Sequence, residues 1–564
     1  MDYKSAYMEK PWLRFYPKGI TSEMKLPEVS VIEAFDDATE KWKNKTALVF
    51  YGKKIRYGEL RDQVDRFATA LHHLGVKKGD RVALHLLNSP QFIIAYFAAM
   101  RLGSIITTIS PVYVSSEIRH QIKDCGAETI ICQDVLYHVI EETNLKFKRV
   151  IITNINEYLP KLARVLGKGI LKGLYKTMET PTFEISEGGG IYQFKSLLKK
   201  FAPDPPHENI DPKNDLAVLP YTSGTTALPK GTMLTHHALV ASEYLLKEFI
   251  AMEEGKEVDL AYMPFYFVGG QLIIMLRALL RGSTLIIFTT PDPDDILAAA
   301  EKYKATIFIG APGMYEILRD YDKTDRVDWK RFKYILAGAD TLLEDTANGW
   351  EKKTGTKLHE CWGMTETSGI GMFTPKGKVK VGSFGIPMSN CLAAIIDPDT
   401  AEFLPVGQVG ELIFHGPGVM KGYWQAPEET RKTLIEIDEK VWLRTGDLVK
   451  MSEDGYFWFY DRKRDRIKYK GYRMSAREIE EVIASHPQVK EVGVIGVPDP
   501  KVGEKVKAIV VSQREARGKL SEAEILKWCE SRLAPYKIPK IIEFRGEIPK
   551  TDIGKVSRRE LREE

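Results

Sequence analysis

The sequence has few cysteines, and none of them stands in a metal-binding spacing. Five cysteines occur in 564 residues, and no Cys-x-x-Cys pair is present. A disulfide framework or a structural zinc site would need more cysteines at closer spacing. We therefore expect neither kind of stabilisation. The five positions are Cys125, Cys132, Cys361, Cys391 and Cys529.

Long apolar runs and a strong excess of one charge are also missing. Lys and Arg number 81 against 77 Asp and Glu, which gives a net charge of +4 and argues against a nucleic-acid partner. No run of 18 uncharged apolar residues is present, so no membrane-spanning helix is expected. The first residues, Met-Asp-Tyr-Lys-Ser, lack the pattern of a signal peptide. A cytoplasmic protein is the expectation.

What the sequence does contain is an alternation of strand and helix patterns. A chain of 564 residues exceeds one ordinary core, so two or more domains are expected. Over residues 45–140 and 214–390 the alternation indicates an α/β fold with mostly parallel sheet. After Asp461 a charged linker leads into a smaller α+β unit. We expect a large domain over residues 1–460, a linker over 461–465 and a small domain over 466–564.

Residues 159–178 interrupt the alternation with a basic, amphipathic pattern. Five Lys and Arg side chains lie among Leu, Val and Ile in this segment. One interpretation is a weak peripheral contact with an anionic membrane, where a fatty substrate would be found. The other is a surface helix that packs its apolar side on the domain, and we favour it because amphipathic helices usually serve their own core.

The segment Tyr221–Gly231, with the sequence YTSGTTALPKG, has the composition of a phosphate-binding loop. Small residues with hydroxyl and backbone N–H donors stand close to the ammonium group of Lys230. Such donors suit a polyphosphate. Because Pro229 precedes the lysine, the segment does not follow the Walker pattern. A polar turn between strands is the alternative, but it would rarely gather so many donors.

This loop resembles the signature of the adenylate-forming superfamily, which includes acyl-CoA synthetases, firefly luciferases and the adenylation domains of peptide synthetases. Further motifs follow in the family's order from about residue 30 to the end, among them Glu360–Glu366 (ECWGMTE) and Arg444–Asp447 (RTGD). The chain is most similar to medium- or long-chain fatty-acid:CoA ligases. The resemblance implies a large adenylate-forming domain with mixed sheets and helices, and a small mobile C-terminal α+β domain.

The resemblance also implies a nucleotide site. Trp362 replaces the family's usual tyrosine, and either aromatic ring can stack on adenine. Thr365 would contact phosphate, Glu366 and Thr222 would hold Mg²⁺, and Asp447 would accept the ribose hydroxyls. The residues that the resemblance assigns to ATP and AMP are Thr222, Ser223, Gly224, Thr225, Thr226, Lys230, Gly338, Ala339, Glu360, Cys361, Trp362, Gly363, Thr365, Asp447, Arg462 and Lys555.

The last hundred residues carry the parts that the family moves between two half-reactions. Arg464 stands at the hinge position of the linker, where Asp461 departs mildly from the family's Gly-Arg pattern. Lys468, Lys470 and Gly471 resemble the segment that binds CoA. Without the resemblance, this charge cluster would be interpreted as a solvated linker.

Lys555 lies in the segment Pro549–Lys555 (PKTDIGK), nine residues before the last residue. A lysine so close to the end of a chain is ordinarily solvated charge. The resemblance instead assigns it catalysis, together with Thr365 and Glu366. Its ammonium group would stabilise the charge that builds on the α-phosphoryl group when a carboxylate attacks.

The segment Pro264–Gln271 (PFYFVGGQ) aligns with the family's acyl pocket, and Phe267 takes the position of an aromatic-gate histidine. A phenyl ring cannot hydrogen-bond a carboxylate, so the entrance should be drier than usual. Gly269 and Gly270 remove bulk beyond it, and Val268 is apolar. Together with the insert at about 145–210, these residues favour aliphatic acids of medium to long chain over acetate or aromatic acids.

The expected function is that of an AMP-forming acid:CoA ligase that uses ATP, Mg²⁺ and CoA. Alternatives are a ligase for a short, hydroxy or aryl acid, and a free-standing adenylation enzyme that loads a carrier protein. A luciferase-like oxygenase has no support in the sequence. A non-catalytic nucleotide-binding protein would be marked by loss of Lys555 or Glu366, and both are present. The acid and the oligomeric state, a homodimer included, stay open.

Overall fold

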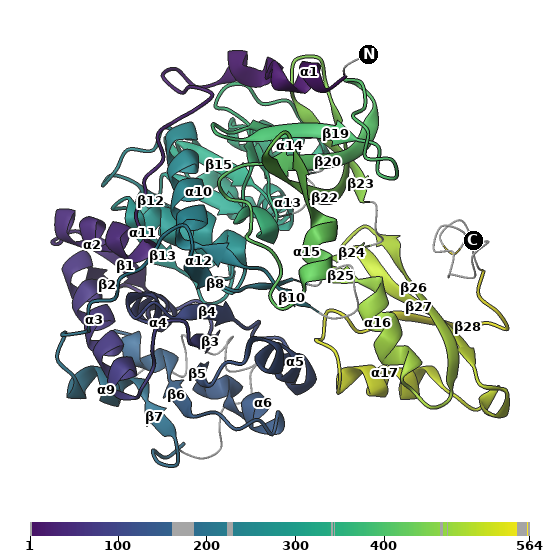
Figure 1. Ribbon diagram of the computed structural model, residues 1–564, viewed down its shortest axis with the longest axis horizontal. Coiled ribbons are helices and arrows are strands. Elements are labelled where there is room, and N and C mark those ends of the chain that lie inside the picture. Colours follow the sequence, from purple (N-terminus) through teal and green to yellow (C-terminus); the bar gives the residue numbers. More distant parts are fainter. Residues whose placement is uncertain are drawn as a thin grey trace.

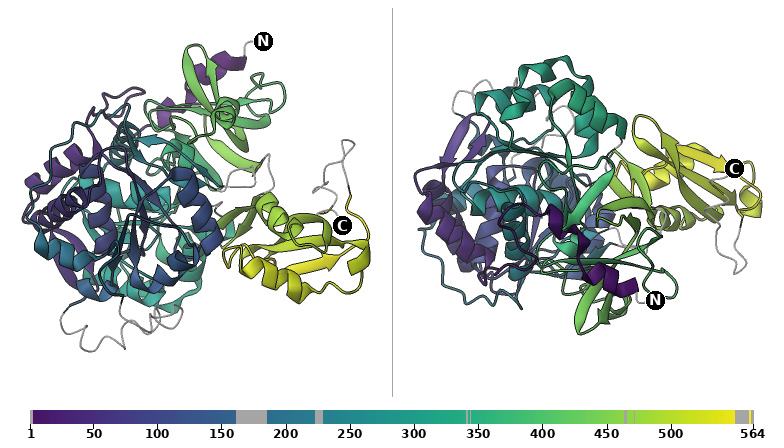
Figure 2. Two further views of the ribbon diagram at one scale, coloured as in Figure 1. Left: turned by 60° about the horizontal axis from the view of Figure 1, so that its bottom comes forward. Right: turned by 90° about the horizontal axis from the view of Figure 1, so that it is seen from above.

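The computed structural model describes residues 3–160, 185–222, 229–339, 342, 344–462, 466–470, 472–549 and 561. Figures 1 and 2 show a large body and a smaller yellow domain at one side of it, which contains the C-terminal end of the chain. This arrangement confirms the expected fold class of a large domain with mixed sheets and helices and a small α+β domain.

The first sheet of the large domain is mostly parallel, as the strand–helix alternation predicts. Its strands lie in the order β11-β8-β4-β3-β5-β6-β7, and only the β11–β8 pair is antiparallel. The strands are β3 (Arg81–His85), β4 (Ile105–Thr108), β5 (Thr129–Gln133), β6 (Arg149–Thr153), β7 (Ile191–Gln193), β8 (Leu216–Val218) and β11 (Leu234–Thr235).

The second sheet of the large domain is mixed. Its strands lie in the order β19-β20-β22-β23-β18-β17-β16-β15-β14-β12-β13-β1-β2, and β21 pairs with β22. In this order, the neighbours from β16 to β1 pair in parallel. The neighbours from β19 to β16 are antiparallel, and so is the β1–β2 pair. The strands are β1 (Thr46–Phe50), β2 (Lys53–Arg56), β12 (Val258–Ala261), β13 (Thr284–Ile287), β14 (Ile307–Gly310), β15 (Tyr334–Ala337), β16 (His359–Trp362), β17 (Met372–Phe373), β18 (Ser383–Pro387), β19 (Leu392–Ile396), β20 (Val409–His415), β21 (Leu434–Ile437), β22 (Lys440–Met451) and β23 (Phe457–Arg462).

Helices cover these sheets, and their ends follow local sequence signals. The hydroxyl of Ser89 caps α4 (Pro90–Arg101), and every residue from Pro90 to Met100 is buried, because this helix lies inside the large domain. The other helices include α1 (Tyr3–Met8), α2 (Val31–Lys41), α3 (Tyr57–His73), α5 (Ser115–Cys125), α6 (Tyr137–Glu142), α9 (Phe194–Lys200), α10 (His236–Phe249), α11 (Arg277–Leu280), α12 (Pro293–Lys302), α13 (Pro312–Asp320), α14 (Glu344–Thr354) and α15 (Pro427–Thr433).

The small domain has its own sheet and core. Its strands lie in the order β25-β24-β27-β26, with β28 on β27, and two helices pack beside them. Ile467, Ile479, Val494, Val510 and Ile525 are all fully buried in this core. The elements are β24 (Arg466–Tyr469), β25 (Tyr472–Ser475), α16 (Ala476–Ala484), β26 (Val489–Asp499), β27 (Gly503–Ser512), α17 (Glu522–Glu530) and β28 (Ile541–Phe544).

The sequence led to two expectations about membranes: no membrane-spanning helix, and a basic amphipathic segment over residues 159–178. Among the helices of the described ranges, none has the length and apolar character needed to cross a bilayer. The basic segment 159–178 lies outside the described residues from residue 161 onward, and the two residues before that point are a buried Leu159 and a half-buried Pro160.

Candidate functional site

The two ends of the predicted phosphate loop form a short antiparallel pair. Thr222 in β9 (Tyr221–Thr222) lies opposite Lys230 in β10 (Lys230–Gly231). Ser223, Gly224, Thr225 and Thr226 lie outside the described residues. The hydroxyl of Thr222 is buried and finds no hydrogen-bond partner in the described part of the chain. A buried hydroxyl without a partner is costly, so this position suits a ligand oxygen or a metal ion.

Lys230 and Glu366 are brought to one place by Tyr423. The ammonium group of Lys230 lies 5.2 Å from the centre of the Tyr423 ring and 2.7 Å from Glu429 Oε2. The Tyr423 hydroxyl donates a hydrogen bond to Glu366 Oε1 at 2.8 Å, and Glu366 is 4 % exposed. Lys230 and Glu366 were predicted for this site from the sequence. Tyr423 and Glu429 were not, because neither belongs to a recognised motif.

Helix α5 holds both ends of the loop. The Tyr221 hydroxyl donates to the Asp124 carboxylate, and His120 Nε2 donates to the carbonyl oxygen of Pro229 at 3.1 Å. Trp424 Nε1 donates to the backbone oxygen of Asp124 at 3.2 Å. Sequence reasoning missed His120 and Asp124, because a lone His and Asp on an amphipathic helix give no signal of their distant partners.

The small residues predicted near adenine are small because strands β15 and β16 lie close together there. Gly338 follows β15 directly, and a Cβ atom at this position would lie 2.7 Å from Cys361 Sγ in β16. Ala339 has a φ of 71°. A Cβ atom at Gly363 would lie 2.2 Å from the carbonyl oxygen of Gly369. Larger side chains at Gly338 and Gly363 would therefore push this part of the site apart.

Trp362 and Asp447 are in direct contact. Trp362 Nε1 donates a hydrogen bond to Asp447 Oδ2 at 2.9 Å, and the carboxylate is 1 % exposed. The indole ring also lies 5.3 Å from the ring of Phe414, centre to centre. The backbone of Arg462 lies opposite Asp447 in the β22–β23 pair. Strand pairing therefore sets the backbone of Arg462 beside Asp447, and the side-chain hydrogen bond fixes the edge of the Trp362 indole on the same carboxylate.

Glu360 is a buried carboxylic acid next to this group. It lies in β16, two residues before Trp362, and is 7 % exposed. Burial raises the pKa of Glu360 to about 8, although backbone N–H groups of Gly382 and Leu342 act in the opposite direction. The side chain is therefore largely protonated at neutral pH and can donate a hydrogen bond as well as accept one. Thr365 begins a short 3-10 turn, η7 (Thr365–Thr367), that carries Glu366.

The predicted acyl segment, Pro264–Gln271, lies close to Gly369, three residues after Glu366, and to Tyr472 of the small domain. Val268 is buried and Phe267 is 43 % exposed. Gly269 has open space where a Cβ atom would lie, whereas a Cβ atom at Gly270 would meet the Pro264 carbonyl oxygen at 2.1 Å. Only Gly269 therefore adds room, and Gly270 permits close backbone packing. It begins a π-helical turn, η4 (Gly270–Leu276), a feature that often marks functional sites and was not predicted.

The small domain presents the CoA-assigned segment to the acyl segment. The ring of Tyr472 lies 6.2 Å from the ring of Phe267, centre to centre. Lys470 is exposed, with a φ of 48°, and Lys468 Nζ lies 4.8 Å from the centre of the Phe459 ring. Gly471, the hinge residue Arg464 and the catalytic candidate Lys555 lie outside the described residues. Their roles stay predictions.

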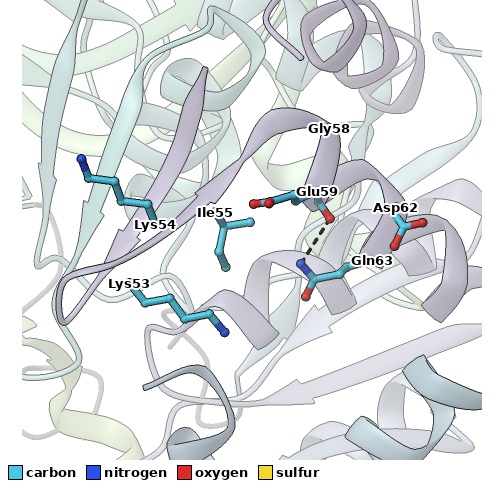
Figure 3. Close-up of a pocket in the computed structure, with 7 residues that line it drawn as sticks. All are labelled: Lys53, Lys54, Ile55, Gly58, Glu59, Asp62 and Gln63. Carbon is cyan, nitrogen blue, oxygen red and sulfur yellow. Dashed lines mark hydrogen bonds between the residues drawn. The ribbon is translucent and has the colours of Figure 1, made fainter. Parts of the chain in front are cut away.

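A separate surface cavity is lined by residues between Lys53 and Gln63, which belong to none of the predicted site motifs. It has a volume of about 470 Å³ and is open to solvent, between β2 and the first turns of α3 (Figure 3). Gln63 Nε2 donates to the backbone oxygen of Glu59 at 3.2 Å within it. None of the predicted site residues lines this cavity, which is formed by Lys53, Lys54, Ile55, Gly58, Glu59, Asp62 and Gln63.

Family models match most of the chain. The model described as AMP-binding enzyme matches residues 35–424, and the model described as AMP-binding enzyme C-terminal domain matches residues 478–555.

Curated relatives match over nearly the full length. A long-chain-fatty-acid–CoA ligase of Bacillus subtilis (strain 168) is 36 % identical over 561 residues, covering 99 % of this chain and 98 % of the relative. A long-chain-fatty-acid–CoA ligase of Escherichia coli O157:H7 is 32 % identical over 571 residues, with the same coverage.

Solved structures share the fold. A long-chain-fatty-acid-CoA ligase (FadD1) from Archaeoglobus fulgidus aligns with a TM-score of 0.74 at 23 % identity, covering 94 % of this chain and 99 % of that one. ATP-bound MatB from Rhodopseudomonas palustris aligns with a TM-score of 0.66 at 27 % identity, covering 95 % and 99 %.

Proposed function

The chain belongs to the AMP-binding enzyme family, and from that premise we propose that it is an AMP-forming acid:CoA ligase for aliphatic acids of medium to long chain. Its family-model matches span 390 residues of the large domain and 78 of the small one, counted from residues 35–424 and 478–555. The observation that carries the proposal is that both ends of the segment Trp362–Glu366 contact predicted site residues. Trp362 donates to the buried carboxylate of Asp447, and Glu366 accepts from Tyr423, whose ring lies beside Lys230.

The nucleotide would be held by groups that match its parts. Lys230 supplies charge for the phosphates, and its present partner Glu429 is a carboxylate that a polyphosphate would replace. Asp447 is a buried acceptor for the ribose hydroxyls. Trp362 and the small residues Gly338 and Ala339 would border adenine.

A magnesium ion fits the oxygen groups at the phosphate end of the site. Thr222 offers a buried hydroxyl without a hydrogen-bond partner in the described ranges, and Glu366 offers a buried carboxylate held by Tyr423. Within those ranges no three His, Cys, Asp or Glu side chains gather as a metal site. We therefore infer that Thr222 and Glu366 would share the ion with phosphate oxygens. When bound, Mg²⁺ would neutralise the charge of the phosphates.

In the first half-reaction, a carboxylate oxygen attacks the α-phosphorus of ATP. The new bond forms the acyl-adenylate, and the bond to pyrophosphate breaks. We assign Lys555 to the stabilisation of negative charge on the α-phosphoryl oxygens, with Thr365 as a further phosphate contact. The chain's own task here is to position the reactants and to present positive charge.

In the second half-reaction, the CoA thiolate attacks the acyl carbon, a thioester bond forms and AMP leaves. We assign Lys468, Lys470 and Gly471 to CoA, and Arg464 to the hinge on which the small domain turns, with domain limits at 1–460, 461–465 and 466–564. The contact between Tyr472 and Phe267 supports this assignment, because it sets the end of the CoA segment beside the acyl segment.

The chain length of the acid rests on two observations. The two bacterial relatives reported above are named long-chain-fatty-acid–CoA ligases. The acyl segment here has an exposed phenyl ring at Phe267, a buried Val268 and free space at Gly269, so its entrance is apolar. Each buried methylene contributes about 0.8 kcal/mol, which favours the longer chain until the pocket ends.

We propose a cytoplasmic protein with at most a weak, salt-sensitive membrane contact through residues 159–178. Sedimentation with anionic liposomes would test the membrane contact, and tight binding that survives high salt would overturn our preference for a surface helix.

A panel of carboxylic acids tests the proposed function. Pyrophosphate release with ATP and Mg²⁺ alone would distinguish an enzyme from a nucleotide-binding protein. Addition of CoA would distinguish a ligase from an enzyme that loads a carrier protein, because only the ligase then releases AMP in repeated turnovers. A preference for acetate, a hydroxy acid or an aryl acid would favour the alternative substrates and leave the ligase chemistry standing.

A further inference from the structure

A buried lysine that the proposed mechanism does not use joins the two domains. Lys537 follows α17 in the small domain and is 1 % exposed. Its Nζ atom donates to Glu117 Oε1 and to Glu478 Oε1, each at 2.7 Å. Glu478 belongs to α16 in the same domain, whereas Glu117 belongs to the first turn of α5 in the large domain. One of the two ion pairs therefore crosses the domain boundary.

The charges in this cluster depend on one another. Burial alone would lower the pKa of Lys537, but Glu478 and Glu117 raise it well above its ordinary value. Burial raises the pKa of Glu117, against the effect of Lys537. A buried charge that loses its partner is strongly unfavourable. Separation of Glu117 from Lys537 must therefore be accompanied by hydration of both groups, which happens if the small domain turns away.

Aromatic rings connect the cluster to the reaction site. The Lys537 ammonium group lies 5.0 Å from the centre of the Tyr113 ring in the large domain. Tyr536, its neighbour in sequence, stacks on Tyr472 with ring centres 4.0 Å apart. Tyr472 in turn contacts Phe267 of the acyl segment. Immobilisation of Lys537 thus also holds the residue that follows Gly471 against the acyl segment.

Helix α5 is the large-domain side of this contact. Its first turn also supplies Ser116, whose hydroxyl donates to the Arg532 carbonyl oxygen at 3.1 Å. Its later turns carry His120 and Asp124, which hold the ends of the phosphate loop. Helix α5 therefore contacts the small domain through its first turn and the two ends of the phosphate loop through its later turns. Figure 1 shows α5 on the side of the large domain that faces the small domain.

On the basis of the proposed function, we propose that Lys537 is a positioning residue for the thioester-forming half-reaction. It fastens the small domain, through Glu117, in the orientation that sets Tyr472 beside Phe267 of the acyl segment. Adenylation requires Lys555 instead, so the Lys537–Glu117 pair must open when the small domain turns for that step. Lys537 acts on CoA only through this orientation and touches no reacting atom.

Glu117→Gln is the sharpest test, because it removes the interdomain charge and leaves the Lys537–Glu478 pair inside the small domain. We expect thioester formation from supplied acyl-adenylate and CoA to fall about tenfold or more, while adenylation stays within about twofold. Lys540→Met, at an exposed lysine of the same domain, is the matched control and should change neither rate. Equal losses in both half-reactions, or no loss in either, would overturn the proposal.

A second readout separates this proposal from the proposed function. Dyes at Lys352→Cys and Lys519→Cys, both exposed and in different domains, would report the interdomain distance by energy transfer without any turnover. Glu117→Gln should broaden the distance distribution, and Lys540→Met should not. An unchanged distribution in Glu117→Gln would refute the fastening role. If the distance distribution broadens in Glu117→Gln but the protein activates no acid, the fastening role of Lys537 stands and the proposed ligase function is refuted.

Discussion

Trp362 Nε1 donates a hydrogen bond to the buried carboxylate of Asp447 at 2.9 Å, so the residue predicted to face adenine and the residue predicted to bind ribose are directly joined. The indole N–H is a donor that fixes both the ring and the carboxylate. The two halves of the nucleoside site therefore depend on one another.

Substitution of Trp362 by Phe keeps an aromatic ring and removes this donor. A hydrogen bond to a charged group is worth about 1.5–3 kcal/mol, so we expect the KM for ATP to rise roughly tenfold or more. The KM for the acid should change little. Initial-rate kinetics with each substrate varied in turn would check this, and an unaltered KM for ATP would show that the bond does not support nucleotide binding.

The raised pKa of the buried Glu360 carboxyl group leads us to expect that the stability of the folded protein depends on pH. This pKa is about 8 in the folded protein, against 4.5 for an ordinary glutamate, because burial disfavours the charged form. A raised folded-state pKa contributes stability that is fully present below the unfolded value and is lost as the pH rises through the folded value. The wild type should therefore lose stability relative to Glu360→Gln between about pH 5 and about pH 9. Denaturation midpoints of both proteins across this range would show it, and parallel curves would speak against a buried neutral acid.

Lys555 and Gly471 should affect opposite half-reactions. Lys555→Ala should slow adenylation by about a hundredfold or more, because it removes charge aimed at the α-phosphoryl group. It should largely spare thioester formation from supplied acyl-adenylate. Gly471→Leu should instead block the CoA step by filling the path of the pantetheine arm. Separate assays of the two steps would check both variants, and an equal loss of both steps in Lys555→Ala would mean that its role is misassigned.

Chain length provides an independent prediction about the acyl pocket. Each buried methylene should add about 0.8 kcal/mol, or roughly fourfold in specificity constant, until the pocket ends. Values of kcat/KM should therefore rise from butyrate toward at least octanoate. A series of saturated acids under identical conditions would measure the rise. A maximum at acetate or at a cinnamate-like acid would contradict the assigned pocket.

The elements that local patterns dictate were predicted well. The alternation of strands and helices expected over residues 45–140 is present, and β3 followed by α4, which Pro90 opens, is one example. The small α+β unit expected after the charged linker is likewise present, with α16 and α17 beside its sheet. The parallel part of each sheet follows from strand–helix alternation, because short strands joined by helices pair in parallel.

The contacts that organise the site could not be predicted in the same way. Tyr221 and Asp124 are 97 residues apart in sequence, and Glu117 and Lys537 are 420 residues apart. No local period or motif reports such pairs, since only the complete fold brings them together. Gly270 illustrates the same limit, because the sequence suggests free space where the backbone of Pro264 in fact packs closely.

The most direct test of the central claim is the product balance of one reaction mixture that contains the protein, ATP, Mg²⁺, CoA and octanoate. Mass spectrometry and nucleotide chromatography would quantify octanoyl-CoA, AMP and pyrophosphate together. The proposed ligase predicts the three products in equal amounts, with none formed when the acid is left out. Formation of ADP and phosphate, or of AMP without the thioester, would contradict it.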